Sequence, residues 1–135
     1  MDCRCRIMNK SQALHQFWSG FGLNAWDENT VPDDAETRGE KYIAYNVSTG
    51  SLDDVLNLTA KIWDTNTTSW KFVEDKAEEI AYTIETMIPP TIQIDNGRLY
   101  ITKGTPFSQR IPNPNETGLV RGVYINIQAE FLTAY

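Results

Sequence analysis

The chain has 135 residues, of which 41% are apolar and 22% charged, and these values are typical of one globular domain. Its formal net charge is −6 at pH 7 and its basic residues are scattered, which argues against a nucleic-acid-binding protein. A chain of this size buries about two-thirds of its unfolded surface, so a core forms without disulfides or metals. We expect a flexible extension over residues 1–8 and a single domain over residues 9–135.

The N-terminal extension holds the only two cysteines, Cys3 and Cys5. A single intervening residue makes a disulfide between them strained, and the pair lacks the further ligands of a zinc site. No long apolar run follows, so the segment predicts neither a signal peptide nor a membrane span. Reduced thiols and a cytosolic chain without membrane contact are expected.

The first periodic segment predicts a helix over residues 10–21. Apolar residues recur at helical spacing along it, namely Leu14, Phe17, Trp18 and Phe21. Asn9 or Ser11 is suited to cap its start. His15, the only histidine, lies beside the stripe and is interpreted as a surface or half-buried side chain and not as a ligand.

An acidic segment from Asn24 to Glu40 follows and predicts a long exposed loop. Trp26 is an apolar anchor within it. The acids do not have the spacing of a calcium loop, so we interpret them as solvated side chains.

Two strands and a second helix come next. Residues 41–47 and 55–63 alternate apolar and polar side chains, and their short connection predicts an antiparallel pair. Residues 69–87 carry one apolar face and predict a helix that Pro89-Pro90 ends.

The C-terminal part predicts a hairpin, a loop and a strand. Asn96-Gly97 separates two alternating runs, residues 91–95 and 98–102, as in a type I′ turn. The segment from Gly104 to Gly118 contains three prolines and predicts a second long loop. Residues 119–131 alternate and predict a long last strand.

This order, α-β-β-α-β-β-β, predicts an α+β fold. We expect a two-layer sandwich in which two helices cover one face of a mostly antiparallel sheet of about five strands. The alternation within the strands indicates that the other face is solvated.

The sequence contains no pattern typical of catalysis. One histidine without a Gly-x-Ser-x-Gly motif gives no nucleophilic triad, and there is no phosphate-binding loop, H-E-x-x-H or paired C-x-x-C. We predict no enzyme, no catalytic residues, no cofactor and no metal. A small hydrolase that uses two carboxylates stays an alternative, because such residues can come from anywhere in a chain.

Aromatic and arginine side chains in loops and on the polar side of strands suggest a protein interface instead. Such residues are enriched where protein surfaces bind one another. The candidate interface residues are Trp26, Phe107, Arg110, Arg121 and Tyr124.

Three parts of the chain resemble a known family. They are His15–Leu23 with Asn29–Pro32, Tyr42–Tyr45, and Gly104–Arg110 with Tyr124–Tyr135. Together they resemble small minor structural proteins of tailed phages and prophages, of the tail-terminator or tail-to-head-joining type. The resemblance runs from about Met8 to the C-terminus, and the cysteine-containing extension departs from it.

The resemblance implies a protein of the virion that is assembled in the host cytoplasm. Such proteins form a hexameric ring that caps the tail tube and joins it to the connector of the head. The expected partners are therefore the chain itself, the tail-tube protein and the neck connector, and DNA passes through the ring without specific binding. The acidic net charge suits a lumen to which DNA does not adhere.

Other functions stay open at this point. A stopper or tail-tube subunit of the same virion has a similar composition. A monomeric, non-viral adaptor would use the same exposed aromatic side chains.

Overall fold

The structure, a computed structural model, describes residues 8–32, 39–50, 54–87, 90–95, 97–112 and 118–133. Its elements along the chain are α1 (Lys10–Ser19), β1 (Asn24–Asp27), β2 (Lys41–Tyr45), β3 (Val55–Asp64), α2 (Lys71–Thr86), β4 (Thr91–Ile94), β5 (Gly97–Arg110) and β6 (Arg121–Thr133). The predicted extension, with Cys3 and Cys5, lies almost wholly outside the described residues.

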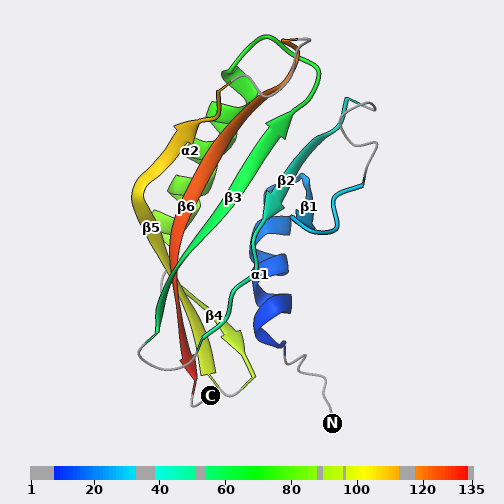
Figure 1. The fold of residues 1–135 in the computed structure, drawn as a ribbon. Coiled ribbons are helices and arrows are strands. Elements are labelled where there is room, and N and C mark those ends of the chain that lie inside the picture. The colour runs from blue at the N-terminus through cyan, green and yellow to red at the C-terminus, as the bar shows by residue number, and fades with distance from the viewer. Residues whose placement is uncertain are drawn as a thin grey trace.

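The strands form one curled sheet in the order β1-β2-β3-β6-β5-β4 (Figure 1). β1 and β2 are parallel, and every other neighbouring pair is antiparallel. The predicted α+β class is confirmed, but the expected two-layer sandwich with about five antiparallel strands is wrong. The sheet is mixed and has six strands.

The extra strand, β1, lies in the segment that we expected to be a loop. Its four residues pair in register with β2, from Asn24 beside Tyr42 to Asp27 beside Tyr45. Ala25 is buried against the core, and Trp26 packs on the opposite side of the sheet. This alternation stabilises the strand in the folded protein, although four residues are too few to stand out in the sequence.

β5 also continues through half of the second expected loop. It pairs with β6 up to Lys103, shifts register, and pairs again from Ser108 to Arg110. Such a shift lets a strand continue past residues that fit a regular ladder poorly, here Gly104 and Pro106. The prediction of a loop over Gly104–Gly118 is therefore wrong for its first half.

The hairpin between β4 and β5 is confirmed, with a different register. Ile94 pairs with Gly97, so Gly97 is the first residue of β5 and not part of the turn. A Cβ atom at Gly97 would lie 2.0 Å from the backbone oxygen of Leu132. Close approach to β6 thus requires a glycine here. The turn type rests on Asn96, which lies outside the described residues.

One hydrophobic core lies between the sheet and the helices. Both helices bury one apolar face in it, α1 through residues including Leu14 and Trp18 and α2 through residues including Val73 and Ile80. The inward side chains of β3, β5 and β6 complete it, with Phe131 fully buried. The predicted cap at Asn9 is confirmed, because its Oδ1 accepts a hydrogen bond of 2.8 Å from the Gln12 backbone N–H.

Candidate protein interface

The outward face of the sheet is the first surface that the candidate residues occupy. Tyr42 and Ala44 of β2 form a small second cluster there, against which Trp26, Val31 and Trp63 pack. The Lys61 ammonium lies 5.7 Å from the ring centroid of Tyr124, its neighbour across β3 and β6. Trp26 and Tyr124 therefore lie on the same face of the sheet. Successive side chains of each strand point alternately to this face and to the helix-covered face, as expected.

Gly122 of β6 leaves room on this face for the indole ring of Trp63, its neighbour on β3. A Cβ atom on Gly122 would lie 2.6 Å from the indole of Trp63 and 3.1 Å from Ile111. The indole thus packs against β6 at a position where no residue larger than glycine fits. This contact explains why Trp63, which is partly buried, remains on the polar side of its strand.

The two arginines lie on the other face of the sheet, at the start of α2. The Arg110 and Arg121 guanidinium carbons lie 4.5 Å and 5.4 Å from the ring centroid of Trp70. Arg110 also donates from Nε to Glu74 over 2.5 Å, and this hydrogen bond raises the pKa of Arg110 above its ordinary value. Both guanidinium groups therefore contact the Trp70 ring of the same chain. Sequence reasoning did not identify Trp70 as their partner.

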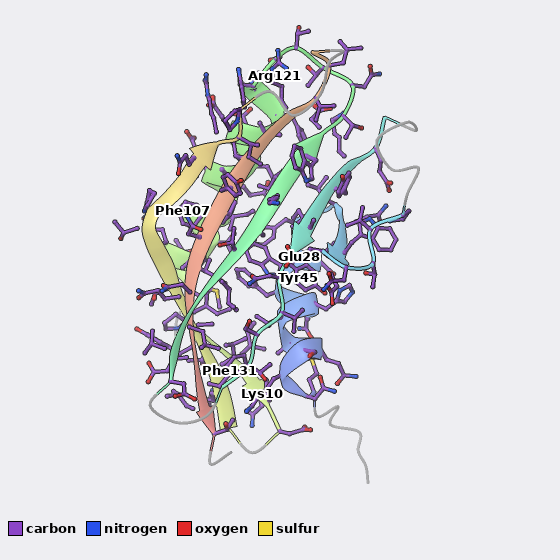
Figure 2. All side chains as sticks on the ribbon, viewed as in Figure 1. Lys10, Glu28, Tyr45, Phe107, Arg121 and Phe131 are labelled. Atoms are coloured by element: carbon purple, nitrogen blue, oxygen red, sulfur yellow. The ribbon has the colours of Figure 1, made fainter. Side chains whose placement is uncertain are left out.

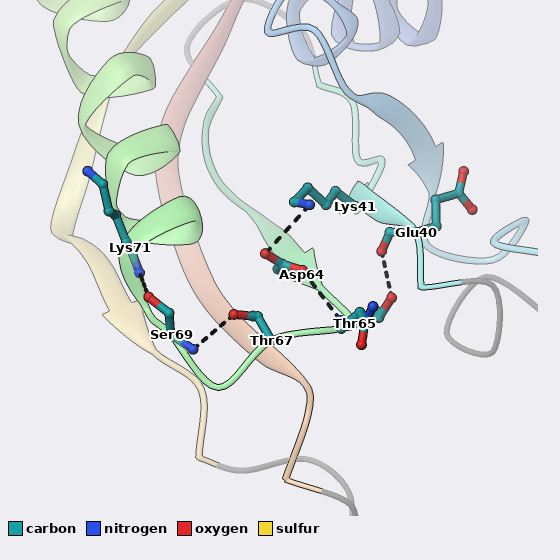
Figure 3. Close-up of polar contacts among 8 residues, drawn as sticks. Glu40, Lys41, Asp64, Thr65, Thr67, Ser69 and Lys71 are labelled. Atoms are coloured by element: carbon teal, nitrogen blue, oxygen red, sulfur yellow. Dashed lines mark hydrogen bonds and ion pairs between the residues drawn. The ribbon is translucent and has the colours of Figure 1, made fainter.

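Polar contacts link the end of β3 to the start of β2, and others lie within the turn before α2 (Figure 3). The buried Asp64 lies 4.0 Å from Lys41, and the Thr65 hydroxyl donates to the Glu40 carbonyl over 2.7 Å. The Lys71 backbone N–H donates to the Ser69 hydroxyl, while Trp70 at the N-cap makes no capping hydrogen bond through its side chain. The first two contacts fix the end of β3 to the start of β2, and the third is local to the start of α2.

Phe107 lies at the edge of the sheet, on the part of β5 beyond β4 (Figure 2). Its side chain is half-buried and packs against the main core, and the Lys103 ammonium lies 5.8 Å from its ring centroid. The structure therefore divides the five candidates. Trp26 and Tyr124 share the outward face, Arg110 and Arg121 surround Trp70, and Phe107 is part of the core edge.

The sequence also gave no sign of a groove between α2 and the end of β5. It has a volume of about 350 Å³ and is lined by Glu74, Ala77, Glu78, Ser108, Gln109, Arg110 and Val123. Neither this groove nor a smaller hollow of about 130 Å³ beside Tyr100 and Glu130 is lined by a histidine.

The only histidine has two polar neighbours on the side of α1. His15 Nδ1 lies 2.9 Å from the Tyr45 hydroxyl, and His15 Nε2 lies 3.2 Å from the Ser19 hydroxyl. Burial, and then the charge of Asp27, raise the pKa of Tyr45. A serine beside a histidine is one part of a hydrolytic site, but His15 and Ser19 are both exposed on one helix and line neither hollow.

Two further observations concern metals and membranes. Within the described ranges, no cluster of three histidine, cysteine, aspartate or glutamate residues is placed to hold a metal ion. In that same part of the chain, neither helix combines the length and the apolar character that a membrane crossing requires.

Comparisons of the chain with protein families, with curated proteins and with solved structures found no match.

Proposed function

We propose that this protein is a structural subunit of a tailed phage, a tail terminator that assembles as a ring on the end of the tail tube. In the virion it would contact the tube protein on one side and the head-neck connector on the other. The proposed ring is a hexamer through which DNA passes without specific binding. The proposal includes no catalytic step, no cofactor and no membrane contact.

The resemblance of three chain segments to the tail-terminator type carries this proposal, and their arrangement supports it. The first segment includes the second half of α1 and the second forms most of β2, and they contact each other where Trp18 stacks on Tyr45 with ring centroids 6.5 Å apart. The third comprises the end of β5 and most of β6, which pair with each other at Ser108 and Gln109. The first two segments thus pack on each other, and the two parts of the third pair as neighbouring strands.

The surface of the described residues gives a second line of support. One face of the sheet carries half-buried aromatic side chains, among them Trp26, Trp63 and Tyr124. Both helices contribute to the core on the opposite face. A sheet face with aromatic side chains that no helix of the described chain covers is suited to contact another protein.

Deleting the gene from the phage or prophage that encodes it tests this function. Electron microscopy of the lysate is expected to show DNA-filled heads separate from tails, many of them over-long, because nothing caps the growing tube. Expression of the chain from a plasmid should restore joined particles. Normal virions in the deletion lysate would refute the proposal, and heads that lose their DNA would point to a stopper instead.

A further inference from the structure

The sheet has two open edges at the same level, on opposite sides of the molecule. Among the described residues β1 pairs with β2 alone and ends the sheet on one side, and the Thr30 N–H donates to the Asp27 carbonyl at the end of this strand. On the other side β4 covers β5 only from Gly97 to Tyr100. From Ser108 to Arg110, β5 therefore has β6 on one side and no paired strand on the other among the described residues.

The pairing register shows that the two edges are the opposite ends of the same rows of paired residues. One row runs from Asp27 through Tyr45, Ala60 and Ile125 to Ser108. Two residues along each strand, another row runs from Ala25 through Ile43, Ile62 and Val123 to Arg110. The five strands β1, β2, β3, β6 and β5 thus share these rows, and the band that they form ends at β1 on one side and at β5 on the other.

Hydrogen bonds at the strand ends show which backbone groups point outward. Ile111 donates to the Gly122 carbonyl over 2.9 Å, so by alternation the Gln109 N–H points to β6 and those of Ser108 and Arg110 point away from it. Glu28 donates to the Tyr45 carbonyl over 2.8 Å, so the N–H groups of Ala25 and Asp27 point away from β2. Each edge therefore presents two outward donors.

The directions of the strands also match. β1 runs parallel to β2, and each of the next three steps across the sheet, to β3, β6 and β5, is antiparallel. β5 therefore runs opposite to β1. When two copies stand side by side in the same orientation, the β1 edge of one meets the β5 edge of the next as an antiparallel pair.

The charges disfavour a contact between two β1 edges. From Asn24 to Glu28 the charged residues are Asp27 and Glu28, so two β1 edges would bring like charges together. On β5, Lys103 and Arg110 are already paired with Glu85 and Glu74 of α2. Pro106 has no N–H to donate and the register shift precedes Ser108, so pairing is confined to the last residues of β5.

We propose that copies of this chain join head to tail by pairing the β1 edge of one copy, Asn24–Asp27, with the Ser108–Arg110 edge of the next. The occupant of each edge is a second copy. A contact between two different edges leaves one β1 edge and one β5 edge unpaired on every dimer. Further copies can therefore add until the rotation from one subunit to the next closes a ring. This inference rests on the proposed function for the ring and names the surfaces that form it.

Backbone substitutions test the contact, because proline removes one outward donor and is tolerated where the N–H faces solvent. Ser108→Pro should weaken self-association about tenfold or more in analytical ultracentrifugation, and Ser108→Ala, which keeps the N–H, should leave it unchanged. At the other edge the pair is Asp27→Pro and Asp27→Asn. Both remove the carboxylate, so weaker association of Asp27→Pro than of Asp27→Asn measures the loss of the N–H alone. A mixture of the two proline variants should form dimers and no larger species, since one open edge of each kind remains.

Hydrogen exchange of single amides gives a second readout that does not depend on how the variants fold. In the dilute wild-type chain the Ser108 and Arg110 amides should exchange fast, and assembly should slow them. The Gln109 amide, bonded to β6, should be protected in both states.

Three results would overturn the inference: a wild-type chain that stays monomeric up to its solubility limit, rings that form equally well from folded Ser108→Pro chains, or unchanged exchange at Ser108 on assembly. If the proline variants form rings as well as the wild-type chain does, the proposed function still stands, because another surface then joins the subunits. Normal virions in the deletion lysate contradict the proposed function alone.

Discussion

The arginine pair on Trp70 makes a prediction about which cations are free to bind a partner. Arg110, whose side chain is 56% exposed, and the half-buried Arg121 both lie within 5.4 Å of the indole centroid. A cation over an aromatic ring contributes about 0.5–1 kcal/mol at an exposed site and about 2 kcal/mol when it is desolvated. We expect a coupling free energy with Trp70 of about 1–2 kcal/mol for the half-buried Arg121, and a smaller one for the exposed Arg110.

Double-mutant cycles measured by urea unfolding test these values. The variants are Trp70→Leu, Arg110→Met and Arg121→Met with the two doubles, because methionine retains an apolar stem without the charge. Arg98→Met is the matched control. Arg98 lies on β5 as well, but its guanidinium contacts the Thr91 hydroxyl and does not reach Trp70. Its coupling with Trp70 should be zero within error.

Coupling below about 0.3 kcal/mol for Arg121, the usual error of additivity, would refute this reasoning. The indole would then not hold the guanidinium, and only its hydrogen bonds to the Gly118 and Val120 carbonyls would keep Arg121 in place. Coupling of equal size for Arg98 would show instead that Trp70→Leu perturbs the whole fold.

Two further predictions concern the backbone and the pH dependence. Gly97→Ala should lower the free energy of unfolding by about 2–4 kcal/mol, because its Cβ would meet the Leu132 oxygen and open the β5–β6 ladder. Gly22→Ala, with a φ of 80° and no atom within 4 Å of its Cβ, should cost only about 1 kcal/mol, and equal losses in urea unfolding would contradict the clash. Because the pKa of Tyr45 is raised, its contribution to stability is present below the unfolded pKa of about 10 and is lost as the pH rises through the folded pKa. Asp27→Asn should lower that pKa in an absorbance titration, and an unchanged value would exclude the effect of the Asp27 charge.

Local patterns predicted the elements that local interactions stabilise. α1 begins at Asn9 because the side chains of Asn9 and Gln12 each accept a hydrogen bond from the other's backbone, and this needs only neighbouring residues. β3 and β6 alternate over ten residues or more, and their inward positions are buried as expected. Periodicity was sufficient wherever one element was long enough to show it.

Elements that depend on distant contacts were missed. β1 is a strand because Ala25 and Trp26 pack on opposite sides of a sheet whose next strand begins at Lys41. Proline and glycine within β5 are typical of loops, and only the register shift against β6 accommodates them in a strand. The arginine pair needs Trp70, which is distant in sequence from Arg110 and Arg121, so no local pattern indicates the contact.

The division of the candidate residues has a consequence for assembly. Since Trp70 and Glu74 engage the arginines and Phe107 packs on the core, only Trp26 and Tyr124 among the five lie on the outward face. Pairing between the edges would use backbone groups that lie in the plane of the sheet, and it would leave this face open. A ring of such subunits would therefore present repeated copies of the outward face, which a tube or connector protein can contact without competing with the ring contacts. One sheet can in this way serve two kinds of partner, its edges for copies of itself and its outward face for a different protein.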